Sequence, residues 1–240
     1  MKISHLAISA AFFLVVTACS KPDKEVTLDS AVSKTTATQS LQEKQSQSVQ
    51  HGDKATPLES YQELKSGKQL MFAYLAIAAE PVDYEKIGLL VSERLRSEGD
   101  EFKKKDLLTS LKPQIDASID KAKQGKYYMM EIGEARDVEK YDFESKSFTV
   151  SNLPQGNGYR YFYDASSYKL TFSNTSAFNK LIVKDEVMAR QIEGLRSKYA
   201  DLKITVYFFA NDTEIGSPII KAEIMKIRLT DARGNVLAQG

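Results

Sequence analysis

The chain has 240 residues, of which 42% are hydrophobic and 27% are charged, proportions that are ordinary for a globular protein. Its formal net charge is +1, and removing Lys2 from the 33 basic residues leaves 32, equal to the 32 acidic residues. A balance of zero beyond Lys2 gives no electrostatic basis for binding nucleic acid or an anionic lipid surface. The composition therefore argues against nucleic acid as a partner.

The start of the chain has the pattern of an export signal. Lys2 supplies a positive charge, and an uninterrupted run of apolar and small residues follows from Leu6 to Val16. This run matches the apolar region of a signal peptide and is shorter than the roughly 20 residues that a membrane-spanning helix needs. We therefore predict a signal peptide over residues 1–18.

The segment Val16-Thr17-Ala18-Cys19 resembles the lipobox of bacterial lipoproteins, with Val16 in place of the usual leucine. The resemblance implies that Cys19 carries a diacylglycerol and that the membrane is a partner through this lipid. Ser20 stands where an aspartate would signal retention in the inner membrane, so the resemblance favours the outer membrane, on its periplasmic side. Cys19 is the only cysteine of the chain, so no disulfide within the chain can stabilise the fold.

Residues 20–56 contain no aromatic residue and are rich in Ser, Thr, Gln and Lys. Such a composition cannot bury enough apolar surface to offset the entropy lost on ordering. We predict that residues 19–56 comprise the lipidated cysteine and a flexible linker, and that a single globular domain covers residues 57–240.

The domain is predicted to begin with helices. Thr56-Pro57-Leu58-Glu59 has the pattern of a helix start, and Pro81 ends the first helix. Apolar residues at helical spacing predict a second helix over residues 84–95 and a third over residues 108–119. Pro113 should kink or divide the third.

From Tyr127 the apolar period changes to two, which is typical of strands. One more helix interrupts the strands, with an apolar face of Met188, Ile192, Leu195 and Tyr199. The apolar parity slips after Ile224, which predicts a β-bulge near Met225. The fold class is therefore α+β, with N-terminal helices followed by an antiparallel sheet interrupted by one helix.

Three segments of the helical part resemble an uncharacterised bacterial lipoprotein family that is known only as a domain of unknown function. They are Pro81–Lys86, Phe102–Leu108 and Lys112–Asp116. The resemblance implies no catalytic motif and therefore no mechanism.

Few residues of the predicted domain suit catalysis or metal binding. It contains no histidine, which removes histidine-dependent hydrolysis and His-ligated metals, and Cys19 is predicted to hold lipid. Acidic residues gather in one stretch, where a pair could act as general acid and base, although strands with a solvated face look the same. We predict no catalytic residue, metal or cofactor. The stretch comprises Glu131, Glu134, Asp137, Glu139, Asp142 and Glu144.

An aromatic stretch gives the one candidate binding surface. Tyr159, Tyr161 and Tyr163 alternate with Arg160 and Phe162, so the tyrosines should share one face of a hairpin. Exposed tyrosines can form a binding surface for sugar or protein, and the alternative is that these tyrosines pack across strands with their hydroxyl groups in solvent. We expect Phe162 to face the core and the tyrosines to face outward.

The sequence leads to a non-enzymatic, lipid-anchored module of the cell envelope that binds another envelope component, such as a protein partner, or assists an assembly. Two alternatives stay open. One is a hydrolase of cell-wall polymers that uses two carboxylates, and the other is an immunity or exclusion factor. The hydrolase requires two carboxylates in a cleft, one of them with a raised pKa.

Overall fold

The computed structural model describes residues 50–156, 158–214 and 216–240, which belong to one compact unit, Val49–Gly240. The predicted signal peptide, Cys19 and residues 20–49 of the predicted linker lie outside the described residues. Residues 50–56, predicted as the end of the linker, are described, and His51 and Asp53 among them contact the sheet. Within the described part of the chain, no helix is both long and apolar enough to cross a membrane.

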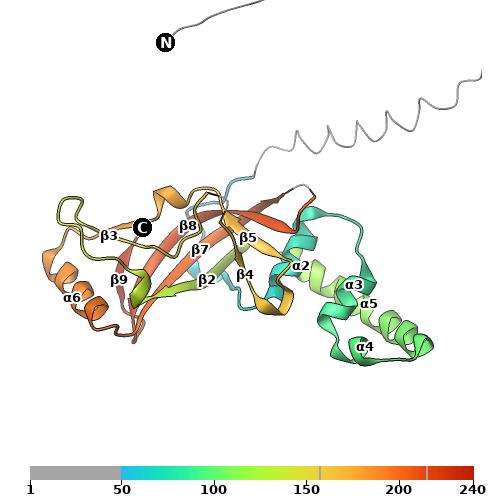
Figure 1. Cartoon of the computed structure of the whole chain (residues 1–240). Helices are drawn as coiled ribbons and strands as arrows, with labels where there is room; N and C mark the ends of the chain where they lie inside the picture. The colour runs from blue at the N-terminus through green and yellow to red at the C-terminus, as the bar shows by residue number, and fades with distance from the viewer. Residues whose placement is uncertain (1–49, 157, 215) are drawn as a thin grey trace, which may run out of the picture. The chain divides into compact units, whose positions relative to one another are not determined.

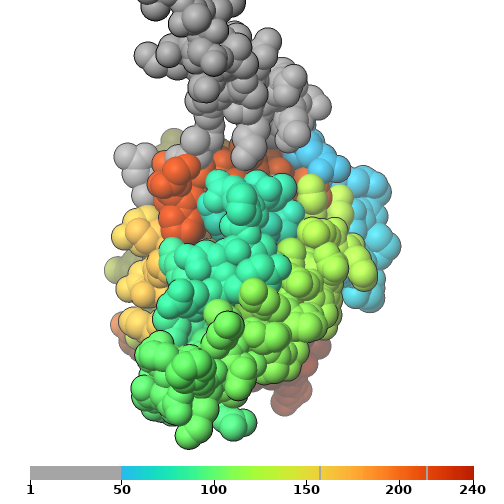
Figure 2. All heavy atoms as spheres, turned by 90° about the vertical axis from the view of Figure 1, so that its right-hand side faces the viewer, coloured from blue at the N-terminus to red at the C-terminus, as the bar shows by residue number. Residues whose placement is uncertain are grey.

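The predicted α+β class is confirmed at the level of a mixed helical and strand domain with a mostly antiparallel sheet. The helices between residues 67 and 123 lie together at one end of the sheet, and α6 lies at the other (Figure 1). Seen from the helical end, residues of these helices form a continuous surface (Figure 2). The helices are α2 (Gly67–Ala78), α3 (Tyr84–Val91), α4 (Glu93–Ser97), α5 (Glu101–Lys123) and α6 (Glu186–Ser197).

The predicted helix start at Thr56–Glu59 is wrong. That segment leads into a short 3-10 helix, η1 (Leu58–Ser60), whereas α2 begins at Gly67. Ser66 caps α2, because its side chain accepts a hydrogen bond from Gln69 N while the Gln69 side chain accepts one from Ser66 N. The backbone N–H of Gly67 also donates to Asp164 Oδ1 at 2.7 Å, a contact that ties the helix start to a segment 97 residues further along the chain.

Two further helix predictions need correction. The helix predicted over residues 84–95 is divided into α3 and α4 at Ser92, whose side chain accepts a hydrogen bond from Leu95 N and caps α4. The predicted third helix is not divided at Pro113, because α5 is one continuous helix of 23 residues that contains this proline. Its buried side chains, Ile115 and Ile119, follow the proline and pack into the core.

The main sheet has the strand order β1-β2-β7-β8-β5-β4, and β9 pairs with β8 beside this path. The prediction of an antiparallel sheet needs correction, because two of the pairings are parallel. They are β1 with β2 and β5 with β8. A second sheet joins β3 to β6. The strands are β1 (Gln62–Glu63), β2 (Tyr127–Glu134), β3 (Ser147–Thr149), β4 (Arg160–Tyr161), β5 (Lys169–Phe172), β6 (Lys180–Ile182), β7 (Leu202–Thr213), β8 (Ile219–Asp231) and β9 (Val236–Gln239).

The predicted bulge at Met225 is confirmed. In the β7–β8 ladder Tyr207 lies opposite Lys226 and Phe208 opposite Ile224, which leaves Met225 as the extra residue. The extra residue shifts the alternation, so Ile224 and Ile227 both reach the main core. Met225 itself is buried on the other face.

The two faces of the main sheet have different surroundings. The inner face, which carries Leu170, Phe208 and Ile220, packs against α2 in the main core. The opposite face, called the outer face here, carries a smaller buried cluster of Tyr61, Tyr207, Phe209 and Met225. The outer face therefore continues beyond this cluster onto β8, β5 and β4, where it bears the candidate site.

Tyr141 and Phe143 lie in a loop and a turn before β3 and not in a strand, although the apolar period of two runs through this part of the sequence. Tyr141 is half-buried, and its hydroxyl donates to Val183 O at 2.8 Å, whereas Phe143 is 83% exposed. Tyr199 was predicted on the apolar face of α6, and this prediction is wrong. The residue lies past the helix end with φ of 51° and is exposed. Ala189 and Ile192 form the buried part of that helix.

Candidate functional site

The acidic stretch does not form a metal site. Within the described ranges, no group of three or more His, Cys, Asp or Glu residues is arranged to hold a metal ion. Glu131 pairs with Lys203 at 3.1 Å, and Glu134 with Arg136 at 3.6 Å, as expected of strands with a charged, solvated face. Hydrogen bonds from Ser145 and the backbone of Glu144 lower the pKa of Asp142, whereas a general acid needs a raised pKa.

The tyrosines of the aromatic stretch face outward, as predicted. Tyr159 and Tyr161 are each 46% exposed and Tyr163, in the short 3-10 helix η3 (Tyr163–Ala165), is 92% exposed. The ring centroids of Tyr159 and Tyr161 are 6.2 Å apart, and those of Tyr161 and Tyr163 are 5.7 Å apart. These three residues, called the tyrosine row here, form a continuous exposed aromatic surface. Phe162, between two of them, is half-buried against the main core.

Arg160 supports the tyrosine row from the inner side of the sheet. Its guanidinium donates to Ile132 O of β2 at 3.2 Å and to Asn152 O. Burial lowers the pKa of Arg160, because the carbonyl oxygens around it replace water only in part. Arg160 is therefore a structural residue and does not join the exposed surface.

The strand register places polar side chains beside the tyrosine row. In the β4–β5 ladder Tyr161 lies opposite Lys169, and continuing this register places Tyr159 opposite Thr171. The ammonium of Lys169 lies 4.0 Å from the centre of the Tyr159 ring, in a cation–π contact. In the β5–β8 ladder Thr171 lies beside Lys221, and Lys221 lies opposite Asp212 of β7. One row of the outer face thus runs from an exposed tyrosine through a hydroxyl to a lysine and a carboxylate.

A groove of about 410 Å³ lies along this row. We call it the polar groove, and it is lined by Gln155, Gly156, Thr171, Phe172, Ser173, Thr175, Ser176 and Lys221. The turn that forms one side of it closes through a hydrogen bond from Gly158 N to Gln155 O at 2.9 Å, with Gly156 at φ of 56°, a conformation that favours glycine. Sequence reasoning missed the groove because the parallel pairing of β5 with β8 joins residues about 50 positions apart.

The hydroxyl groups of the polar groove are oriented by backbone carbonyls. Thr171 Oγ1 donates to Gly158 O at 3.0 Å, Ser173 Oγ to Ala222 O at 3.2 Å, and Thr175 Oγ1 to Pro154 O at 2.8 Å. A hydroxyl has one hydrogen, so these three oxygens are left as hydrogen-bond acceptors. The Lys221 ammonium adds donors, and the groove therefore offers both kinds of polar group.

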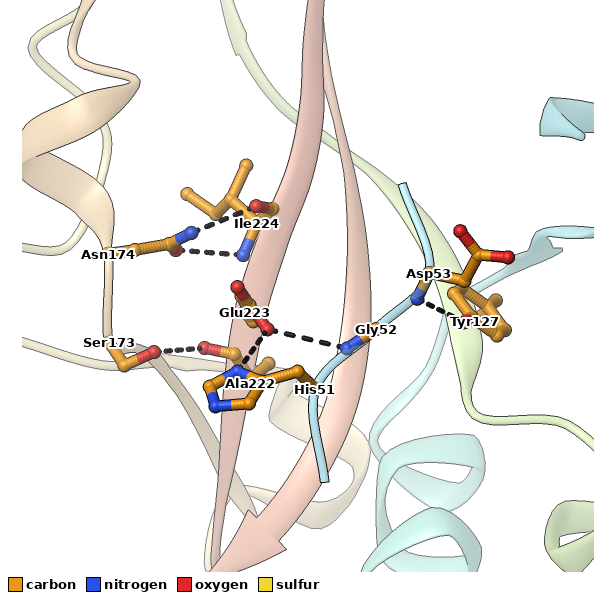
Figure 3. Close-up of polar contacts among 9 residues, drawn as sticks. All are labelled: His51, Gly52, Asp53, Tyr127, Ser173, Asn174, Ala222, Glu223 and Ile224. Atoms are coloured by element: carbon orange, nitrogen blue, oxygen red, sulfur yellow. Dashed lines mark hydrogen bonds and ion pairs between the residues drawn. The ribbon is translucent and has the colours of Figure 1, made fainter. Parts of the chain in front are cut away.

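The chain enters the described structure across the outer face, beside the groove. His51 Nδ1 lies 3.2 Å from Glu223 Oε2, and Gly52 N donates to the same oxygen at 3.4 Å. Asp53 N donates to the Tyr127 hydroxyl at 2.7 Å. Figure 3 shows these contacts together with those of Ser173 and Asn174, which reach β8 at Ala222 and Ile224. Residues 50–53, called the strap here, therefore lie next to the Ser173 end of the polar groove.

The site combines exposed aromatic rings with oriented hydroxyl groups, a geometry suited to binding. The tyrosine row and the polar groove share the outer face of β4, β5 and β8, and each is accessible from solvent. No family model, curated protein or solved structure matches the chain.

Proposed function

We propose that the chain is a lipid-anchored protein of the cell envelope whose domain binds another envelope component, without catalysis, through the tyrosine row. The lipobox-like segment Val16–Cys19 motivates the anchor on Cys19, and the outer membrane, on its periplasmic side, is the proposed location. The proposed partners are the membrane, through this lipid, and an envelope component that contacts the tyrosines.

One observation carries the binding part of the proposal. Three successive outward residues of one segment are tyrosines, and their rings contact one another while at least 46% of each residue stays exposed. Exposed Tyr163 adds no burial to the core, so the stability of the domain does not explain it. Tyrosine presents a large apolar surface with a polar tip and few rotatable bonds, which suits contact with a ligand or partner.

Photo-crosslinking in cells tests this proposal. A photoreactive phenylalanine analogue replaces Tyr163 in the full chain, and the same analogue at Tyr199 serves as a control, since Tyr199 is 77% exposed and lies beyond α6, outside the tyrosine row. We expect adducts with an envelope component at position 163 and not at 199. Adding Tyr159→Ser and Tyr161→Ser should reduce these adducts. Equal adducts at both positions, or none at 163, would contradict the proposal.

A further inference from the structure

The polar groove and the tyrosine row together have the chemistry of a carbohydrate site. We infer that the ligand bound at the tyrosine row is an uncharged glycan, whose sugar rings stack on the tyrosines while its hydroxyl groups bond in the polar groove. The inference rests on the proposed function, because it names the ligand class of the same surface.

The polar atoms of the groove call for a ligand that both donates and accepts hydrogen bonds. The oxygens of Thr171 and Ser173 are acceptors, since both hydroxyl hydrogens are donated to backbone carbonyls. The Lys221 ammonium can only donate. A sugar hydroxyl supplies a donor and an acceptor from one group, so adjacent hydroxyls of one sugar can satisfy both kinds of partner.

The charges around the groove are balanced, which favours an uncharged ligand. Lys169 and Lys221 lie on the outer face of β5 and β8, and Asp212 lies opposite Lys221. Glu223, two residues along β8 on the same face as Lys221, supplies a second carboxylate, and its Oε2 lies 3.2 Å from His51 Nδ1. Two lysines beside two carboxylates give no net attraction for an anionic lipid surface or a nucleic acid.

The arrangement of the rings also favours a flexible chain of sugars over a flat surface. The planes of Tyr159 and Tyr161 are inclined by 51°, and those of Tyr161 and Tyr163 by 79°. Inclined rings present separate faces, each of which can pack against one sugar ring. They do not form one plane on which a flat protein or membrane surface could lie.

The groove and the rings are close enough to hold one ligand. Thr171 Oγ1 bonds to Gly158 O, the residue directly before Tyr159, and Lys169 covers one side of the Tyr159 ring while lying opposite Tyr161. A ligand seated on the rings of Tyr159 and Tyr161 therefore reaches the edge of the groove without crossing another element.

A glycan array probed with the purified full chain in detergent tests the inference. The array carries neutral hexose and N-acetylhexosamine oligosaccharides beside carboxylated and sulfated ones. We expect binding to neutral oligosaccharides. Salt weakens attraction between charges, and a neutral ligand carries none, so raising the salt concentration should not abolish this binding. Binding confined to the charged oligosaccharides, or absent throughout, would overturn the inference.

Variants test whether the binding uses this site. Tyr161→Ser and Lys221→Gln should each lower the affinity for the best neutral oligosaccharide by about tenfold or more, as for central contact residues elsewhere. Tyr199→Ser and Lys198→Gln, exposed residues beyond the last turn of α6, are the matched controls and should bind as the wild type does. Tyr163→Ser replaces Tyr161→Ser if the latter fails to fold, because Tyr163 is the most exposed of the three tyrosines. Equal losses in the control variants would refute the assignment of the site.

The two proposals fail in different ways. Adducts at position 163 together with a silent array would leave the proposed binding surface standing and remove the glycan. The absence of both adducts and array signals would remove both proposals.

Discussion

Replacing Gly52 by alanine should loosen the strap from the sheet. A Cβ at position 52 would lie 2.7 Å from Met225 Sδ and 2.8 Å from Phe209 Cβ. The thioether of Met225 can move, since methionine is flexible. Phe209 Cβ cannot move without its backbone, which is paired on both sides, with β2 and with β8. The strap must therefore shift away from β7 to admit a methyl group.

Two estimates set the expected loss in the free energy of unfolding. Forcing an extra methyl group into a packed site costs about 1–3 kcal/mol. Detachment of the strap limits this loss, because it gives up two backbone hydrogen bonds, Gly52 N to Glu223 and Asp53 N to the Tyr127 hydroxyl, each worth about 0.5–1.5 kcal/mol. We expect a loss of about 1–2 kcal/mol, and each kcal/mol lowers the melting temperature of a domain of this size by about 2–4 °C.

Thermal melts and amide hydrogen exchange measure this effect. Gly52→Ala should lower the melting temperature and speed the exchange of the Asp53 amide. Gly194→Ala is the control, because a Cβ there meets no atom within 4 Å and the residue lies inside α6, where alanine should add about 0.5–1 kcal/mol of stability. A Gly52→Ala variant that melts with the wild type and keeps a slowly exchanging Asp53 amide would show that the strap is not packed as described.

Three other predictions concern different parts of the chain. Phe162→Ala should lower the free energy of unfolding by an amount near the lower end of about 3–5 kcal/mol, whereas Tyr161→Ser should lower it by about 0.5 kcal/mol or less. Thermal melts in which Tyr161→Ser is the more destabilised variant would contradict the inward position of Phe162. The hydrogen bond from Arg196, followed by that from Tyr141 N, lowers the pKa of Glu193. The contribution of this carboxylate to the free energy of unfolding is therefore complete above its pKa in the unfolded chain and is lost as the pH falls through its lower pKa in the folded protein. The stability difference between wild type and Glu193→Gln should narrow in acid, and a difference that does not vary with pH would contradict this prediction. Cys19→Ala should release the protein or leave it as a precursor, whereas intact-mass analysis showing a free N-terminal Cys19 in the wild type would exclude lipidation.

The sequence allowed some details of the sheet to be predicted because they depend on local alternation. A change in apolar parity after Ile224 located the bulge at Met225, since an extra residue shifts every later side chain to the other face. The same alternation put Tyr161 and Phe162 on opposite faces, and in the structure Tyr161 is exposed while Phe162 packs against the main core. Both predictions needed only the period of two, which holds along a strand whatever the strand pairs with.

The helix start could not be chosen from local pattern. Thr56-Pro57-Leu58-Glu59 and Ser66-Gly67-Lys68-Gln69 both have the spacing of a capping box. The second starts a helix because it fits a tertiary contact, in which Gly67 N donates to Asp164. A Cβ at position 67 would lie 2.8 Å from Ala165 N, so the glycine permits this approach. The residues of the two local segments do not indicate which of them contacts residues 164 and 165.

The strap was assigned to the linker for a related reason. Composition predicts order from apolar side chains, and residues 50–53 have few of them. These residues contact the sheet instead through backbone N–H groups. Gly52 has no side chain, so the backbone can approach Phe209 and Met225 closely. The polar groove escaped prediction because it depends on which strands become neighbours, and the parallel β5–β8 pairing has no local sequence signal.

The outer face explains why the tyrosine row is a better candidate than the other exposed aromatic residues. On β7 and β8 the aromatic and apolar side chains of this face, Phe209 and Met225 among them, are buried beneath the strap and Tyr61. The same face on β4 bears Tyr161, which is 46% exposed. Isolated exposed aromatics such as Phe143 occur on most surfaces, whereas three contacting rings beside a groove of oriented hydroxyls combine stacking surface with hydrogen-bonding groups. Because the strap covers the apolar part of the face and leaves this part open, the exposed tyrosines are available to a ligand.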